Sequence, residues 1–334
     1  MKNFWKELKH PIIVLAPLAG ITDAAFRFLC GKNGADVVYS EMVSAAGLFY
    51  DSERTSGLLD RYKSNGGAKF VVQLFGNDPK HFAKAVKIVE KFKPDGIDIN
   101  FGCPVPKVQK AGAGVKLFQD LELSHRVIEA CIKNTKLPIS VKTRIKAGNI
   151  SVLDFIEKIK DLPITALMVH GRTLAQGFSG EVDYQLLNRA KKKFKGVFIA
   201  NGGITNIESA QEMLKKTEAD VIAIGQAACG KPWIFKEIKK HFVILNGAKR
   251  SEESILDRQA SLRSTGTQDD KKKNGVLQIA LKHAKLMHKL KGEAGIREMR
   301  KHLCWYAKGL SGAAELRKEF VKVETLKDIK KLLK

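Results

Sequence analysis

The chain has 334 residues, 44% of them hydrophobic and 28% charged, which supplies a large core and excludes a chain that is disordered throughout. Fifty-nine Lys and Arg against 35 Asp and Glu give a net charge of +24, which indicates a polyanionic partner such as RNA, DNA or an acidic membrane surface, or else a Lys-rich proteome. Five scattered cysteines without a Cys-x-x-Cys pair exclude a disulfide framework and a structural zinc site. They favour a reducing cytoplasm, and no segment approaches the roughly 18 apolar residues of a membrane span.

Eight short apolar runs recur through the first two-thirds of the chain, each followed by a stretch with helical periodicity. Their near-continuous apolar character is typical of parallel strands that helices cover on both faces. Eight such units predict an α/β fold, a (β/α)8 TIM barrel, followed by a small C-terminal helical domain. The predicted strands are Ile12–Ala16, Val37–Ser40, Phe70–Leu74, Gly96–Asn100, Ile139–Lys142, Ala166–His170, Val197–Ala200 and Asp220–Gly225.

The composition divides the chain into three predicted segments. Residues 1–245 contain the predicted strands and are expected to form the barrel. Residues 246–275 are polar with few large apolar side chains, and we predict a flexible linker or surface loop there. Residues 276–334 regain helical periodicity and carry 15 Lys and Arg against 6 Asp and Glu. This pattern suits a nucleic-acid-binding helical domain or a solvated pair of Lys-rich helices.

Glycine-rich turns and polar side chains follow the carboxyl ends of the predicted strands, where barrels carry their active sites. The turns Asn201-Gly202-Gly203 and Gly225-Gln226-Ala227 allow backbone N–H groups to approach an anion such as a cofactor phosphate. Several cationic or polar residues end neighbouring strands, and an anion would compensate their charges. These residues are Gln73, Lys142, Arg144, His170 and Arg172.

Cys103 lies in a turn between Gly102 and Pro104, where neither helix packing nor strand pairing requires a thiol. A thiol with an ordinary pKa of about 8.5 is mostly protonated at neutral pH and can act as a general acid. A thiolate nucleophile is the alternative, although the sequence suggests no His–Asp pair beside it. Composition leaves both roles open.

These residues together resemble the tRNA-dihydrouridine synthase family, and most closely its bacterial B-type branch. The resemblance covers nearly the whole chain, and the order and spacing of its segments make it specific. The segments are Ala16–Arg27, Gln73–Pro79, Asp98–Val108, Ser140–Arg144, His170–Gly180, Asn201–Gly203, Gly230–Phe235 and Arg297–Gly309.

The resemblance implies an FMN site at the carboxyl end of the barrel, a uracil site beside it, and no metal. Residues expected to hold FMN are Pro17, Leu18, Ala19, Gln73, Lys142, His170, Asn201, Gly202, Gly203, Gly225 and Gln226. Asn100, Arg144 and Arg172 are expected to bind the substrate, and Cys103 to be catalytic.

The resemblance also implies the reaction, in which NADPH reduces the flavin and flavin N5 passes a hydride to C6 of a D-loop uridine in tRNA. Cys103 would then protonate C5. The protein is expected to be a monomer that binds tRNA through its basic tail. Two departures stand out, because the family usually has Gly-Arg where this chain has Gly225-Gln226, and Asn-Gly-Asp where it has Asn201-Gly202-Gly203.

Two other functions compete with this one. A flavoenzyme acting on free pyrimidines, such as a dihydroorotate or dihydropyrimidine dehydrogenase, shares the barrel but does not need a basic tail. A non-catalytic RNA-binding relative is the second alternative. The presence of Cys103, Lys142 and His170 argues against it, whereas Gln226 leaves it open.

Overall fold

A computed structural model describes residues 3–248 and 267–333. The chain divides into two compact units, Met1–Gly225 and Gln226–Lys334, which are described one at a time. The first unit contains all the strands that the structure describes, and the second is helical.

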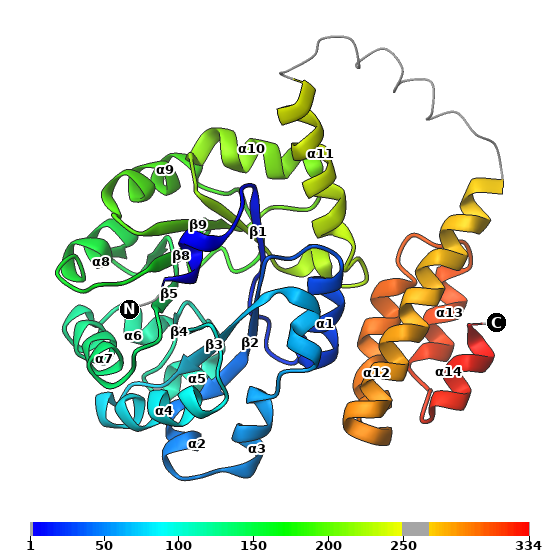
Figure 1. Cartoon of the computed structure of the whole chain (residues 1–334), viewed down its shortest axis with the longest axis horizontal. Helices are drawn as coiled ribbons and strands as arrows, with labels where there is room; N and C mark the ends of the chain where they lie inside the picture. Colours follow the sequence, from blue (N-terminus) through cyan, green and yellow to red (C-terminus); the bar gives the residue numbers. More distant parts are fainter. Residues whose placement is uncertain (1–2, 249–266, 334) are drawn as a thin grey trace. The chain divides into compact units, whose positions relative to one another are not determined.

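Eight parallel strands form a closed barrel in the order β1-β10-β9-β8-β5-β4-β3-β2, with helices on its outside (Figure 1). The predicted (β/α)8 barrel is therefore confirmed, and each predicted strand overlaps an observed one. Between β5 and β8, the short strands β6 (Lys146–Ala147) and β7 (Ile150–Ser151) form an antiparallel pair. The barrel strands are β1 (Ile12–Leu15), β2 (Val37–Ser44), β3 (Lys69–Phe75), β4 (Gly96–Phe101), β5 (Ile139–Arg144), β8 (Ala166–His170), β9 (Val197–Asn201) and β10 (Val221–Ile224).

The barrel helices begin at side chains that cap their first backbone N–H groups. Asp78 caps α4, Asp120 caps α7 and Asn206 caps α10, each accepting a hydrogen bond from a backbone N–H of the first turn. The helical segments of this unit are η1 (Phe4–Glu7), α1 (Ala24–Lys32), α2 (Ala45–Phe49), α3 (Glu53–Ser56), η2 (Gly57–Leu59), η3 (Lys63–Gly67), α4 (Pro79–Lys91), α5 (Pro106–Lys110), α6 (Val115–Phe118), α7 (Leu121–Asn134), α8 (Val152–Lys158), α9 (Tyr184–Lys193) and α10 (Ile207–Thr217).

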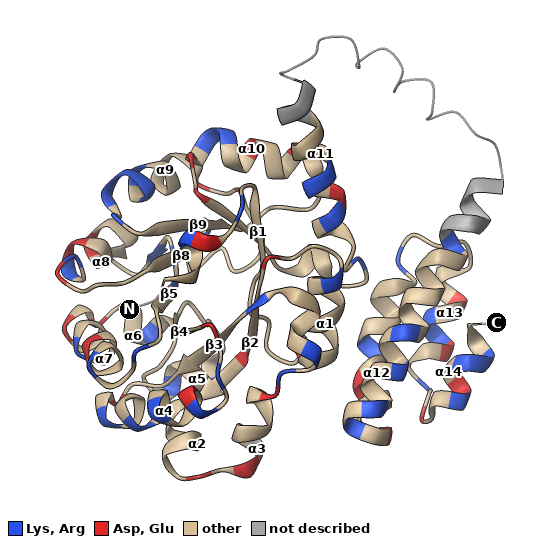
Figure 2. Cartoon of the chain, viewed as in Figure 1, with Lys and Arg blue, Asp and Glu red and all other residues tan. Residues whose placement is uncertain are grey.

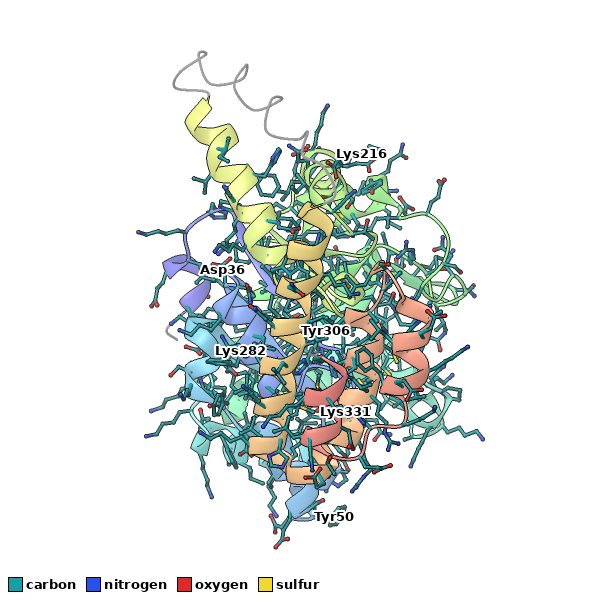
Figure 3. The ribbon with its side chains drawn as sticks, turned by 90° about the vertical axis from the view of Figure 1, so that its right-hand side faces the viewer. Asp36, Tyr50, Lys216, Lys282, Tyr306 and Lys331 are labelled. Carbon is teal, nitrogen blue, oxygen red and sulfur yellow. The ribbon has the colours of Figure 1, made fainter. Side chains whose placement is uncertain are left out.

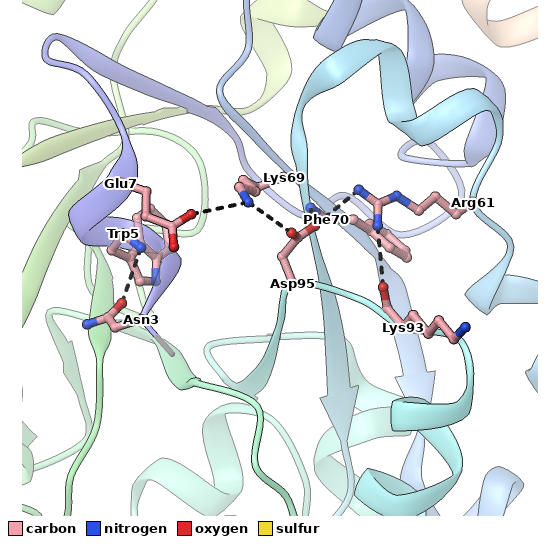
Figure 4. Close-up of polar contacts among 8 residues, drawn as sticks. All are labelled: Asn3, Trp5, Glu7, Arg61, Lys69, Phe70, Lys93 and Asp95. Carbon is pink, nitrogen blue, oxygen red and sulfur yellow. Dashed lines mark hydrogen bonds and ion pairs between the residues drawn. The ribbon is translucent and has the colours of Figure 1, made fainter. Parts of the chain in front are cut away.

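The amino end of the barrel is closed by the residues that precede β1. Phe4 and Trp5 are buried and belong to the same core cluster as Val14 and Val71. A polar network lies near this end, where Lys69 pairs with Glu7 at 3.6 Å and with Asp95 at 3.3 Å (Figure 4). Arg61 reaches the other oxygen of the same Asp95 carboxylate at 3.1 Å. Apolar side chains and ion pairs thus fill this end, and the carboxyl end is the one where barrels carry their sites.

The second unit consists of η4 (Gln226–Ala228), α11 (Ile234–Ala248), α12 (Thr267–Tyr306), α13 (Ala313–Phe320) and α14 (Leu326–Leu332). This confirms the predicted C-terminal helical region. Lys and Arg are spread along α12, α13 and α14 (Figure 2). Tyr306 is buried among these helices, whereas Lys282 and Lys331 are exposed (Figure 3).

The linker predicted for 246–275 lies mostly outside the described residues. At its two ends α11 extends to Ala248 and α12 begins at Thr267. Across the described ranges, no helix is long and apolar enough to cross a membrane.

Candidate active site

Strand register brings five of the predicted site residues together at the carboxyl end of the barrel. Asn100 of β4 pairs with Lys142 of β5, and Arg144 pairs with His170 of β8. His170 in turn pairs with Asn201 of β9. Because neighbouring parallel strands end at the same side of the barrel, these five residues form one continuous arc.

The turn that carries Cys103 is held by hydrogen bonds on both sides. The side-chain oxygen of Asn100 accepts from the backbone N–H groups of Gly102 at 3.1 Å and of Cys103 at 2.9 Å. Arg144 donates from Nε to the carbonyl oxygen of Gly102 at 3.0 Å, and the N–H of Val115 donates to that of Cys103 at 3.1 Å. The backbone of this turn is therefore fixed before any ligand arrives.

The Cys103 thiol lies in mostly apolar surroundings. Its side chain packs with Val108 and Ala113, and the partly buried Met42 and Phe75 pack against the same cluster. Burial raises the pKa of the thiol, although the Val105 backbone and the charges of Arg144 and Lys142 act in the opposite direction. The thiol is consequently protonated at neutral pH, which favours a proton donor over a thiolate nucleophile.

A hydrogen-bonded chain of side chains runs behind this turn. Asn100 donates from Nδ2 to Oε1 of Gln73 at 2.9 Å, and Gln73 donates from Nε2 to Oδ2 of Asp98 at 2.7 Å. The second Asp98 oxygen accepts from the hydroxyl of Ser140 at 2.6 Å. Gln73 and Asp98 are completely buried. Our sequence analysis did not select Asp98, although a carboxylate inside an apolar strand, two residues before Asn100 and on the same face, was a usable signal.

Positive charge is concentrated at the ends of β5 and β8. Burial lowers the pKa of Lys142 to about 8, with a smaller contribution from the neighbouring charge of Arg144. Burial and the positive charges of Lys142, Arg144 and Arg172 lower the pKa of His170 to about 2. His170 is therefore neutral at physiological pH, and the remaining cations favour an anionic ligand.

The two arginines predicted to bind substrate hold the loop between β8 and α9. Arg144 is almost fully buried and donates from Nη1 to the carbonyl oxygens of Thr173 and Gly177, both at 2.9 Å. Arg172 donates from Nε to the carbonyl oxygen of Gly180 at 2.8 Å. Phe178, which our sequence analysis did not select, lies in this loop with its side chain 60% exposed and its ring 5.8 Å from the Arg144 guanidinium carbon.

In the turn after β9 the backbone lies so close to neighbouring side chains that there is no room for a Cβ atom, as in turns that bind phosphate through backbone N–H groups. Gly202 has a φ of 111° and Gly203 a φ of 72°. A Cβ atom on Gly202 would lie 2.6 Å from Cδ2 of His170. Asn201 donates from Nδ2 to the carbonyl oxygen of Ala223 at 2.8 Å, which ties this turn to β10. The geometry requires glycine and leaves the backbone accessible to an anion.

The turn after β1 and the residue after β10 complete the barrel part of the predicted cofactor site. Leu18 donates its N–H to the hydroxyl of Thr22 at 3.1 Å, and Pro17 and Leu18 are half-buried while Ala19 is exposed. A Cβ on Gly225 would lie 3.7 Å from Cδ2 of Leu18, an ordinary contact. Gln226 begins the second unit, and its side chain is exposed. Within residues 3–248 and 267–333, no group of three or more His, Cys, Asp or Glu could hold a metal ion.

Solved structures with a similar fold are distant in sequence. Histamine dehydrogenase from Rhizobium sp. 4-9 aligns with 70% of this chain and 46% of its own, at a TM-score of 0.55 and 12% identity. A morphinone reductase mutant aligns with 69% of this chain and 86% of its own, at a TM-score of 0.52 and 11% identity. These similarities establish the barrel fold.

Sequence comparison identifies nearer relatives. A probable tRNA-dihydrouridine synthase of Rickettsia conorii is 34% identical over 308 residues, which are 91% of this chain and 87% of that protein. A tRNA-dihydrouridine synthase B of Vibrio parahaemolyticus is 34% identical over 94% of this chain and 91% of its own length. The family model described as dihydrouridine synthase (Dus) matches residues 14–334. The chain therefore belongs to the dihydrouridine synthase family, in its bacterial B-type branch.

Proposed function

We propose that the protein is a cytoplasmic, monomeric tRNA-dihydrouridine synthase that uses FMN and NADPH to reduce the C5=C6 bond of specific D-loop uridines. The observation that carries this proposal is the Cys103 thiol, which is kept protonated by burial in a turn fixed by Asn100 and Arg144. The names of the relatives, as tRNA-dihydrouridine synthases, support the same substrate.

The residues at the carboxyl end fit an FMN group. The backbone of Gly202 and Gly203 lies open where a Cβ would collide with neighbouring side chains, which suits the ribityl phosphate. Lys142 is a half-buried cation that would stabilise electron density on the flavin ring. His170 is neutral and can therefore donate one hydrogen bond without adding further charge beside Lys142 and Arg144.

When bound, a reduced flavin supplies a hydride to C6 of the target uracil. The protein contributes the proton. Hydride addition leaves negative charge shared between C5 and the C4 carbonyl, and the Cys103 S–H can transfer its proton to C5. The resulting thiolate is stabilised by the positive charges of Arg144 and Lys142, which act on it in this site. Solvent then returns a proton to the sulfur, and the thiol is restored.

The basic second unit supports a polyanionic substrate rather than a free pyrimidine. Residues 276–334 carry 15 Lys and Arg against 6 Asp and Glu, and many of these lysines are exposed on α12 and α14. Phosphate groups of tRNA would release counterions on binding such a surface. The target uridine must be turned out of the folded tRNA to reach a site at the end of the barrel.

Purified protein should be yellow, or become so with FMN, and NADPH should bleach it without oxygen. Cys103→Ala should keep flavin and tRNA binding but lose at least about a hundredfold in dihydrouridine formation, because the general acid is missing. Cys131→Ala is the matched control, since Cys131 is a buried thiol on α7 away from the strand ends.

Three results would contradict the proposal or redirect it. A colourless protein that FMN cannot reconstitute would exclude a flavoenzyme and favour a non-catalytic RNA-binding protein. Reduction of free uracil at the rate seen with tRNA would favour a free-pyrimidine enzyme. Unchanged turnover in Cys103→Ala would show that another group supplies the proton.

A further inference from the structure

Asp98 is a buried carboxylate at the start of the hydrogen-bonded chain that ends at the Cys103 turn. It lies in the middle of β4, and its side chain has no exposed surface. Its two oxygens are occupied by different strands, Oδ2 by Gln73 of β3 and Oδ1 by Ser140 of β5. The carboxylate therefore connects the two strands that flank the one carrying Asn100.

The direction of every hydrogen bond in this chain follows from Asp98. An ionised carboxylate only accepts, so Gln73 must turn its amide nitrogen toward Asp98. The amide oxygen of Gln73 then faces Asn100 and can only accept from its nitrogen. This leaves the oxygen of Asn100 for the backbone N–H groups of Gly102 and Cys103. Reversing one amide would place two donors or two acceptors against each other at the next contact.

An ionised Asp98 lowers the stability of the folded state, because the carboxylate is removed from water. This burial is the main cause of its raised pKa. Burial raises the pKa of Asp98 to about 6, against the opposing effects of the hydrogen bonds from Gln73 and Ser140 and the charge of Lys142. Its sequence neighbours Ile97 and Ile99 are fully buried apolar residues. A buried carboxylate is stabilised only by its hydrogen bonds and neighbouring charges, so we take the hydrogen-bonded chain as the reason for its position.

We propose that Asp98 is a positioning residue for the reduction: its carboxylate sets the amide orientations of Gln73 and Asn100 and through them holds the peptide that carries Cys103. The role of this peptide in proton transfer rests on the proposed function. The geometric part, that Asp98 controls the Cys103 turn, does not depend on turnover and can be measured without it.

Two substitutions separate the acceptor role of Asp98 from its charge. Asp98→Asn keeps an oxygen to accept from Gln73 and turns an amide nitrogen toward the Ser140 hydroxyl, so the direction of the chain is preserved. Asp98→Leu has a similar size but no acceptor, so Gln73 loses its orienting partner. Thr217→Val is the matched control, because Thr217 is also fully buried and its hydroxyl donates to the carbonyl oxygen of Met213 at 2.6 Å within α10, outside this chain of hydrogen bonds.

The first measurement is the rate at which iodoacetamide alkylates Cys103 in the full-length protein, followed by peptide mass spectrometry. Asp98→Leu should raise this rate at least about fivefold, since the hydrogen bonds that hold the backbone of the turn are loosened. Asp98→Asn and Thr217→Val should stay within about twofold of the parent chain. An unchanged rate in a folded Asp98→Leu protein overturns the proposal. If that variant does not fold, Gln73→Met breaks the chain at its next link and must show the same increase.

The second measurement is the rate at which tRNA lacking dihydrouridine reoxidises the NADPH-reduced protein. This reoxidation should be more than about tenfold slower in Asp98→Leu than in the parent chain, because the proton donor is no longer held in position. In Asp98→Asn most of the rate should be retained, because the orientation of Gln73 and Asn100 is kept. Equal slowing in both variants would show that charge, not orientation, is the contribution of Asp98, and would overturn the proposal. If the parent chain itself is not reoxidised by tRNA, the proposed function fails, while the alkylation result still decides the positioning role.

Discussion

Asn100 and Cys103 are joined by a single hydrogen bond of 2.9 Å, from the Cys103 backbone N–H to the Asn100 side-chain oxygen. Asn100 also accepts from Gly102, and its nitrogen donates to Gln73 and contacts the sulfur of Met42 at 3.2 Å. The hydrogen-bonding groups of Asn100 are thus engaged by the protein itself. The residue predicted to face the uracil therefore has a structural role in holding the proposed acid.

Asn100→Ala should destabilise the protein by about 1–3 kcal/mol, because two backbone N–H groups in a buried turn lose their acceptor. It should also slow reoxidation of the reduced protein by tRNA more than it slows reduction by NADPH. Urea unfolding and stopped-flow absorbance measure these effects. Asn188→Ala is the control, since Asn188 makes side-chain hydrogen bonds on α9, away from the strand ends. Equal effects of the two substitutions would contradict the assignment.

Gly202→Ala should weaken FMN binding by at least about tenfold, since the new Cβ would lie 2.6 Å from the His170 ring and displace a predicted cofactor contact. Gly67→Ala separates this contact from backbone strain. Gly67 has a φ of 102°, close to the 111° of Gly202, but nothing lies within 4 Å of its Cβ position. Fluorescence titration of FMN measures both affinities. A similar loss of affinity in the two variants would point to strain rather than to the cofactor turn.

Asp98→Asn should make the protein more stable at pH 7 than the parent chain, by up to about 3 kcal/mol for a pKa displaced by about two units. The folded-state pKa of Asp98 is raised to about 6 from its ordinary 3.8, so the folded state binds more protons between these values. The parent chain consequently loses this stability as pH rises from about 4 to about 6, whereas the amide variant does not. Urea unfolding at pH 4.5 and pH 7 should show the difference between the two proteins growing with pH. A difference that shrinks or stays constant would contradict a buried, ionised carboxylate.

Replacing Lys282 and Lys285 with Gln should weaken tRNA binding and flatten its dependence on salt, because each lysine that neutralises a phosphate contributes to the salt slope. Both side chains are exposed on α12. Lys87 and Lys91 on α4 are also exposed and give a control with the same change in net charge. Filter binding across a range of KCl concentrations measures the slopes. Equal slopes for the two double variants would assign the effect to net charge rather than to the second unit.

The amino-acid sequence by itself determined the barrel and the location of its site. Strands buried on both faces are continuous apolar runs, so periodicity located all eight, and β8 was predicted with its observed ends. The largest difference is at β2, which extends to Ser44 rather than Ser40. The strand continues past Ser40 because its pairing with β3 shifts register between Tyr39 and Met42, which accommodates the half-buried Glu41. A search for apolar runs ends a strand at such a polar residue and so misses the extension.

The tertiary structure decided which polar groups meet at the carboxyl end. The alternation of side chains along β4 puts Asp98 and Asn100 on one face, but Gln73 comes between them from a different strand, 25 residues from Asp98 in the chain. In the same way, only the folded chain shows that Arg144 donates to the backbone of Gly102, Thr173 and Gly177. Its role in substrate binding stays a prediction. The burial pattern of a strand follows from its own sequence of apolar and polar residues. A hydrogen bond between strands depends instead on their register around the closed barrel, and only the folded chain fixes that register.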